Sequence, residues 1–412
     1  MASDPQTQAC FQQLEAGLKS SLGASMARLQ AAAGGAALAE GVPPGAASAG
    51  KVRPPFDEKG ITSEWLTAAL HERGHLPKAV KVARIEPLVN IGEGRGYANY
   101  SWKITATYDK PVAPDIPTQF VLKQINRTCK AALSLLSRGR LTKSCCAESF
   151  DANWPPGHMR QLADKSYCLE CSWYEQLRDR LPIPQPRLFW SGAESPADPS
   201  KDLGVYGVLI EWLGDDLKKV DLKDGVTEEE TVQAMTTLAR LHAAWWNTEE
   251  EEALSALFKP EESLQMILGF MGGAELASEY AATTFKEAFG DKFASYVAAG
   301  VRTMEDWAFK GCTGDRNRVL CTWDLRTENM VWRRTPGGPD DYECVILDHQ
   351  VWCYGGAPMF DLAVFFGCSC AEETMAERVE VGLRAYHSTL TSLGVTTYSE
   401  AEMHADFTRY AR

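Results

Sequence analysis

Two short segments decide how this chain folds: residues 321–332 read CTWDLRTENMVW, and residues 345–350 read VILDHQ. In the first segment, Asp324 and Asn329 lie on a polar loop, with the spacing Asp-x4-Asn, between two apolar strand-like runs. In the second, Asp348 ends the apolar run VIL. Such a loop, followed by a hairpin strand that ends in Asp, can place two carboxylates and one amide oxygen around a single cleft.

These three side chains match the needs of phosphoryl transfer. One carboxylate must orient the attacking hydroxyl and accept its proton, while an amide oxygen and a second carboxylate hold Mg²⁺ on the phosphates. We expect Asp324 to be the base, and Asn329 and Asp348 to be the metal ligands. Asp and Asn are common turn residues, so the loop spacing alone is a weak signal. The strand that ends in Asp348 strengthens it.

The rest of the chain predicts two lobes. Strand patterns come before the site and include one helix; the strands cover residues 79–91, 100–108, 118–125, 187–192 and 204–214, and the helix covers 161–180. The first three strands read as an antiparallel meander. Helical patterns dominate after Asp224, and they cover residues 227–247, 261–308 and 371–394. This order predicts an α+β, two-lobed protein-kinase-like fold, with an N-terminal antiparallel sheet, one helix, and a larger, mostly helical C-terminal lobe.

Composition shifts suggest three parts. Residues 1–55 are rich in Ala, Gly and Pro after one amphipathic helix pattern, and we interpret them as a linker or disordered extension. Residues 56–213 form the predicted N-terminal lobe, and residues 214–412 form the C-terminal lobe. A polar insertion around residues 126–160 interrupts the first of these lobes.

Composition also limits the partners. Lys and Arg number 42, and Asp and Glu number 55, for a net charge of −13. This balance argues against nucleic acid, because phosphate backbones need clustered cations. No apolar run reaches the roughly 18 residues needed to span a bilayer, and the 12 cysteines do not read as a disulfide framework in so long a chain. We expect a cytoplasmic protein with no membrane span, although the N-terminal helix leaves organelle targeting open.

The strand-rich half contains a candidate phosphate-binding lysine. Lys123 lies on the run FVLKQI, where its ammonium can reach phosphates as a point charge. A lysine in this role needs an acid to hold it, and the next helix offers Glu170 and Glu175. We choose Glu170, with Glu175 as an acid that faces solvent.

A glycine-rich turn and a short connector complete the predicted nucleotide site. In GEGRGYANY, Gly92, Gly94 and Gly96 would let backbone amides approach phosphates, although such turns are also common in hairpins. Glu211 and Leu213 fall where a connector between lobes would offer backbone groups to adenine. We therefore expect ATP and Mg²⁺ as cofactors.

Taken together, the motifs resemble the aminoglycoside-phosphotransferase and choline-kinase group, above all its ecdysteroid-kinase-like branch. That family's catalytic loop is His-Gly-Asp-x4-Asn, and its metal Asp follows on the next strand. LARLHAAWW (238–246) and APMFDLAVF (357–365) match two further family segments, and Glu170 followed by Tyr174 matches its E-x3-Y pattern. The resemblance spans about residues 60–395, and it implies that Asp361 braces the catalytic loop.

One departure from the family leaves a second hypothesis open. The family's His-Gly is Thr322-Trp323 in this chain. Thr322 could keep one hydrogen bond, whereas a bulky Trp323 beside the cleft would reshape the substrate side. The alternative is a catalytically impaired, nucleotide-binding pseudokinase or a scaffold.

The resemblance implies a small-molecule hydroxyl as the phosphate acceptor. The A-P-E and D-F-G triplets of protein kinases are absent, and APMFDLA follows Asp348 too closely to leave room for an activation loop. Sterol-like alcohols, amino alcohols and sugars all remain open as acceptors. For His242 and His349 we favour structural roles, and for Cys168 and Cys171 a place in the core over zinc binding.

Overall fold

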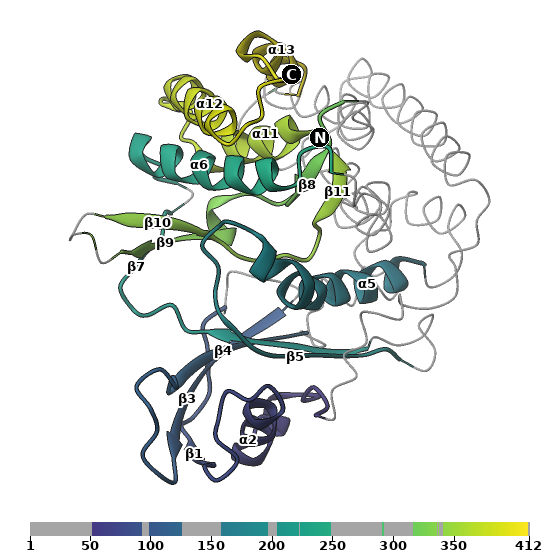
Figure 1. Cartoon of the computed structure of the whole chain (residues 1–412), viewed down its shortest axis with the longest axis vertical. Coiled ribbons are helices and arrows are strands. Elements are labelled where there is room, and N and C mark those ends of the chain that lie inside the picture. The colour runs from purple at the N-terminus through teal and green to yellow at the C-terminus, as the bar shows by residue number, and fades with distance from the viewer. Residues whose placement is uncertain are drawn as a thin grey trace, which may run out of the picture.

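The computed structural model describes residues 52–92, 99–125, 158–196, 204–221, 223–248, 316–335 and 341–410, together with Asp291 and Gly337. Figure 1 shows a sheet at one end of the molecule and a group of helices at the other. The predicted α+β architecture of two lobes is therefore confirmed.

The N-terminal lobe is an antiparallel sheet in the order β1-β3-β4-β6-β5, with β2 also paired to β3. Its strands are β1 (Val82–Ile85), β2 (Val89–Asn90), β3 (Asn99–Tyr108), β4 (Gln119–Ile125), β5 (Leu188–Glu194) and β6 (Val205–Glu211). The predicted strand 79–91 is two strands, and Pro87 between them has no N–H to donate to a ladder. Lys123 pairs with Ser101, so both side chains lie on one face of the sheet.

The other face of this sheet packs against α2 (Ser63–Glu72). Thr62 caps the helix: its Oγ1 accepts from the N–H of Trp65 at 3.1 Å. The indole of Trp65 donates to the carbonyl oxygen of Arg53 at 3.0 Å, and the amide of Gln124 donates to that of Pro55. Residues 52–55, assigned to the extension from sequence, thus pack against the lobe, while residues 1–51 lie outside the described residues.

The predicted helix 161–180 is confirmed with an earlier start. It consists of α5 (His158–Ser172), a π-helix η2 (Trp173–Leu177) and a 3-10 turn η3 (Arg178–Arg180). In Figure 1, α5 lies between the N-terminal sheet and the strands β8 and β11 of the C-terminal lobe. Leu169 and Cys171 belong to the large core that continues into that lobe, whereas Tyr167 and Cys168 pack with Ile125 and Tyr206 of the N-terminal sheet.

Short strands carry the predicted catalytic loop, residues 322–329. They are β7 (Leu217–Lys218), β8 (Val319–Cys321), β9 (Met330–Arg334), β10 (Tyr342–Ile346) and β11 (Cys353–Gly356). β8 pairs with β11, while β9 pairs with β10 and β7. Because β9 and β10 are antiparallel, the end of β10 returns to the start of β9. The N–H of Leu347 donates to the carbonyl oxygen of Asn329 at 2.8 Å, which brings Asp348 next to Asn329.

The C-terminal lobe is otherwise helical, with α6 (Glu228–Ala244), α11 (Pro358–Ser369), α12 (Met375–Ser392) and α13 (Glu400–Tyr410). α6 begins after the N-cap Thr227, where Thr227 and Glu230 form a reciprocal capping box at 3.2 and 2.7 Å. The prediction for residues 261–308 falls outside the described residues, apart from Asp291. Among the described helices, none is long and apolar enough to cross a membrane.

Candidate active site

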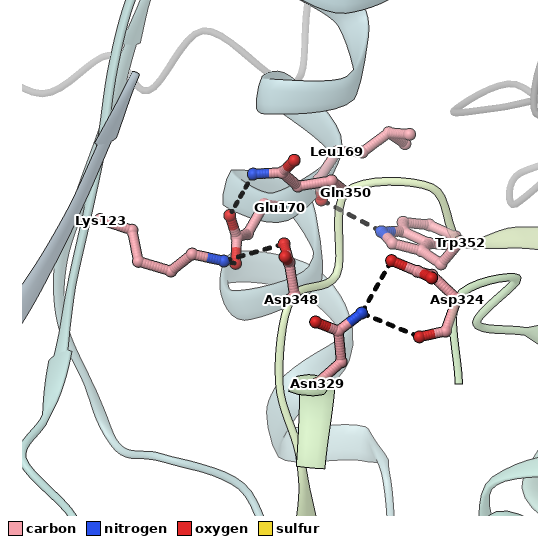
Figure 2. A network of polar contacts seen from close by, with 8 residues as sticks. All are labelled: Lys123, Leu169, Glu170, Asp324, Asn329, Asp348, Gln350 and Trp352. Carbon is pink, nitrogen blue, oxygen red and sulfur yellow. Dashed lines mark hydrogen bonds and ion pairs between the residues drawn. The ribbon is translucent and has the colours of Figure 1, made fainter. Parts of the chain in front are cut away.

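The catalytic loop joins β8 to the 3-10 turn η5 (Thr327–Asn329). Asn329 Nδ2 donates to both the carbonyl oxygen of Asp324, at 2.9 Å, and its Oδ2, at 2.7 Å. The amide nitrogen is therefore engaged by Asp324. Figure 2 shows the Asn329 oxygen on the opposite side, toward Asp348. The predicted base and the two predicted metal ligands thus lie together.

Asp361, at the start of α11, holds the backbone of this loop. Its buried carboxylate accepts from the N–H groups of Thr322 and Trp323 at 2.7 and 2.8 Å. It also lies 3.3 Å from Nε2 of His242, whose Nδ1 is 2.7 Å from the hydroxyl of Tyr386. The brace implied by the resemblance is present, and His242 has the structural role expected of it.

Trp323 does not lie where the sequence placed it. Its side chain is only 3% exposed and stacks on Phe360, with ring centroids 4.4 Å apart, so it does not line the cleft. Its backbone φ is +63°, in the left-handed region that favours glycine. The side chain of Thr322 does not form the hydrogen bond expected of it, since its Oγ1 has no partner among the described residues.

Lys123 connects the two lobes. Its ammonium pairs with Glu170 of α5 and lies 3.0 Å from Oδ1 of Asp348, 225 positions later in the chain (Figure 2). The second oxygen of Glu170 accepts from Nε2 of Gln350 at 3.3 Å. The predicted pair of Lys123 and Glu170 is therefore present, and it contacts the predicted metal ligand Asp348.

Glu175 is not the acid that holds Lys123. Its carboxylate accepts from the hydroxyl of Ser191 and pairs with Arg73, within the N-terminal lobe. Glu175 is therefore an ion-paired residue rather than a solvent-facing acid without partners.

Burial and neighbouring charges set the ionisation of the site. Burial alone would lower the pKa of Lys123, but the carboxylates of Asp348 and Glu170 more than offset this and raise its pKa, so the lysine stays charged. Burial raises the pKa of Glu170, and the charge of Lys123 opposes that rise. Burial also raises the pKa of Asp324 to about 6, against the opposing charge of Arg326.

The glycine-rich turn is described only at its start. The N–H of Gly92 donates to Oδ1 of Asn90 at 3.2 Å. A Cβ at Gly92 would lie 3.4 Å from the side chain of Ser101, the strand partner of Lys123. Gly92 therefore lies beside Ser101, the residue of β3 that pairs with Lys123. Gly94 and Gly96 lie outside the described residues.

The connector residues keep the status of predictions. Glu211 ends β6, and its N–H donates to the carbonyl oxygen of Arg187 at 2.9 Å, so this N–H is engaged within the sheet. Leu213 follows just before Gly214, whose φ is +104°. Nothing in the described contacts tests whether either residue meets a nucleotide base.

Two site residues were missed from sequence. Nε of Arg326 lies 2.9 Å from Oδ1 of Asp324; its place two positions after the base was the available signal. Gln350 had no such signal, because its partner Glu170 is 180 positions away. His349 is buried and stacks on Trp173 at 3.8 Å, which agrees with the structural role favoured for it.

The cysteine pair of α5 also follows its prediction. The side chains of Cys168 and Cys171 are both buried, at 3% and 2% exposure. Burial raises the pKa of the Cys171 thiol, which disfavours the thiolate that zinc binding needs.

Residues 214–395 match the model of the ecdysteroid kinase-like family. The C-terminal lobe is similar to the ecdysteroid kinase-like family over these residues. The match includes the whole predicted catalytic loop, the predicted metal ligand Asp348 and the brace Asp361, so the resemblance is confirmed over this lobe. No curated protein sequence matches the chain.

Solved structures of small-molecule kinases are similar to this chain over most of its length. An ethanolamine kinase from Plasmodium vivax is 13% identical, covering 86% of this chain and 87% of that one, with a TM-score of 0.39. The choline kinase LicA from Streptococcus pneumoniae is 16% identical, with coverages of 79% and 86% and a TM-score of 0.36. An aminoglycoside-3′-phosphotransferase of type VIII is 15% identical, with coverages of 82% and 94% and a TM-score of 0.37. The kinase-like fold is assigned from the lobes and the pairing described above.

Proposed function

We propose that this chain is an ATP-dependent phosphotransferase that phosphorylates a hydroxyl of a small molecule. The proposal is carried by the convergence of Asp324, Asn329 and Asp348 with the ion pair of Lys123 and Glu170. Packing alone gives no reason to gather four ionisable groups from both lobes. Lys123 and Glu170 are nearly buried, while Asp324 and Asp348 are more than a third exposed beside them. Such clusters are typical of functional sites.

The residues of the proposed metal site fit Mg²⁺. Asp348 offers a carboxylate whose side chain is 36% exposed, and Asn329 offers an amide oxygen on the side away from Asp324 (Figure 2). Hard oxygen donors of this kind, few in number, suit Mg²⁺ bound together with phosphates. When bound, the ion would supply positive charge against the phosphate oxygens.

Lys123 is suited to contact the phosphates of ATP. It is charged and is positioned by two carboxylates from different parts of the chain. Glu170 holds it from α5, so the direction of the ammonium depends on the placement of that helix. A fixed point charge of this kind orients phosphates without bidentate geometry.

Asp324 is suited to orient an acceptor hydroxyl and take its proton. Its side chain is 37% exposed and therefore accessible. Asn329 holds both its carbonyl oxygen and its carboxylate, and Asp361 braces the preceding residues. With a pKa of about 6, it is deprotonated at neutral pH, yet more basic than an ordinary Asp, as a general base should be.

Two observations favour a small-molecule acceptor over a protein. The C-terminal lobe matches the ecdysteroid kinase-like family. The segment between Asp348 and the start of α11 at Pro358 also contains the strand β11, which leaves no length for an activation loop.

The pseudokinase alternative rests on Thr322 and Trp323. The Thr322 side chain makes no hydrogen bond among the described residues, but both backbone N–H groups are held by Asp361. The ring of Trp323 is buried away from the cleft. The departure from His-Gly therefore leaves the brace of the loop intact, and we favour an active enzyme.

A thermal-shift titration with ATP, with and without Mg²⁺, tests the proposal on wild type and Asp348→Ala. A ligand that binds only the folded state raises its melting temperature. We expect a Mg²⁺-dependent rise in wild type that is lost in Asp348→Ala, and we would follow it with a phosphotransfer screen of small alcohols. A Mg²⁺-independent rise would favour the pseudokinase, and no rise at millimolar ATP would favour a scaffold.

A further inference from the structure

Residues Asp348–Trp352 form a segment, named here the strap, that leads from the metal site to β11 along α5 (Figure 2). Gln350 is its middle residue. Nε2 of Gln350 donates to Oε2 of Glu170 at 3.3 Å, while the other oxygen of Glu170 pairs with Lys123. The carboxylate of Glu170 is therefore held from both sides, by a strand of its own lobe and by the strap.

Trp352 fixes the same turn of α5 through the backbone. Its buried indole donates from Nε1 to the carbonyl oxygen of Leu169 at 3.1 Å, one residue before Glu170. The indole also meets Trp173 at a centroid distance of 5.8 Å, and Trp173 stacks on His349 of the strap. His349 also meets Tyr174, at a centroid distance of 5.8 Å, so the strap contacts four positions within residues 169–174.

We propose that Gln350 and Trp352 are positioning residues that hold α5 so that Glu170 stays on Lys123. The inference rests on the proposed function and adds the means by which the ion pair is kept in place. The pair belongs to the N-terminal lobe, yet the helix that supplies Glu170 is held by a segment of the C-terminal lobe that begins at Asp348. Packing and two hydrogen bonds from the strap then keep Lys123 and Glu170 paired, so no longer segment is needed to hold α5 in place.

Two variants remove the strap contacts, and a third provides a matched control. Trp352→Phe removes the indole N–H that reaches Leu169, and Gln350→Leu removes the amide that reaches Glu170. Trp332→Phe is the control, because Trp332 is also fully buried but its Nε1 has no partner among the described residues. Both Phe variants lose the same atoms, and only one of them loses a hydrogen bond to α5.

Hydrogen exchange of the ligand-free protein gives a readout that does not need activity. We expect amides of residues 169–174 to exchange roughly tenfold faster in Trp352→Phe and Gln350→Leu than in wild type. Trp332→Phe should leave their exchange unchanged. Equal exchange of α5 in wild type and both strap variants would overturn the proposal.

A double-mutant cycle on Mg-ATP affinity then tests whether Gln350 affects nucleotide binding through Glu170. Gln350→Leu should weaken the binding of Mg-ATP by about three- to tenfold in wild type, and by much less in a Glu170→Gln background, because Gln350 acts through Glu170. Independent, additive effects would overturn this role. If wild type does not bind ATP at all, the proposed function fails, while the exchange experiment still decides whether the strap positions α5.

Discussion

The carboxylate of Asp361 lies 3.3 Å from Nε2 of His242, and both side chains are fully buried. Through this contact, α6 and α11 together position the Asp361 carboxylate, which accepts hydrogen bonds from the N–H groups of Thr322 and Trp323. The conformation of the catalytic loop therefore depends on two helices outside it. This explains how the loop keeps its geometry without the His-Gly of the family pattern.

Trp323→Gly tests whether Trp323 impairs catalysis. The substitution relieves a residue at φ +63°, but it leaves a cavity next to Phe360. Loss of a large buried aromatic side chain costs about 3–5 kcal/mol, and relief of the backbone conformation returns about 1–2 kcal/mol. We expect urea unfolding to show a net loss of about 2–3 kcal/mol, with phosphotransfer at 25 °C close to that of wild type.

Trp323→Phe is the control for this experiment, because it keeps an aromatic ring on Phe360 and the same backbone conformation. A large gain in turnover in Trp323→Gly alone would instead support the pseudokinase hypothesis.

Asp324→Asn should reduce turnover by about 10²–10⁴-fold, since a positioned general base contributes a factor of that order. The affinity for Mg-ATP, measured by calorimetry, should change little because Asn329 and Asp348 remain. Glu328→Gln is a suitable control: it removes an exposed acid from the same loop. Full activity in Asp324→Asn would refute the assignment of the base.

The raised pKa of Asp324 also predicts a pH dependence of stability in the metal-free protein. An ordinary Asp has a pKa of about 3.9. In the folded state, the pKa of Asp324 is raised to about 6. Between these values the folded state binds more protons than the unfolded chain, so this residue's contribution to stability falls as the pH rises.

Denaturant unfolding of wild type and Asp324→Asn between pH 4 and pH 7 checks this prediction. The Asn variant should gain stability relative to wild type as the pH rises through the window. The gain should be modest, because the side chain is 37% exposed. A difference that stays constant with pH would contradict the raised pKa.

Lys123→Met should destabilise the fold as well as weaken ATP binding. It leaves the nearly buried carboxylate of Glu170 without its cation, and breaking a buried pair in this way costs about 3–5 kcal/mol. The double variant Lys123→Met/Glu170→Leu removes both charges and should recover much of that stability, but not nucleotide affinity. A double variant less stable than Lys123→Met would show that the pair has no such coupling.

The candidate site residues that lie together, as the sequence predicted, share local spacing. Asp324 and Asn329 belong to one loop, and Asp348 follows the strand that pairs back onto it, so the pattern of polar residues and apolar runs was enough to bring them together. The same holds for Thr62 and Thr227, whose helices begin where capping residues meet an apolar periodicity. Lys123 and Glu170 were found by their order in a known motif rather than by spacing.

Sequence alone determined the two-lobed order of strands and helices and the proximity of Asp324, Asn329 and Asp348, because these depend on periodicity and on contacts within one loop and hairpin. Only the tertiary structure decided that Trp323 turns into the core, that His242 supports Asp361, and that the strap reaches α5. Each of these depends on side-chain packing or on a partner outside the local segment: 119 positions separate His242 from Asp361, and 183 separate Trp352 from Leu169. Local spacing carries no information about such pairs, since they meet only when segments far apart in the sequence pack around one core.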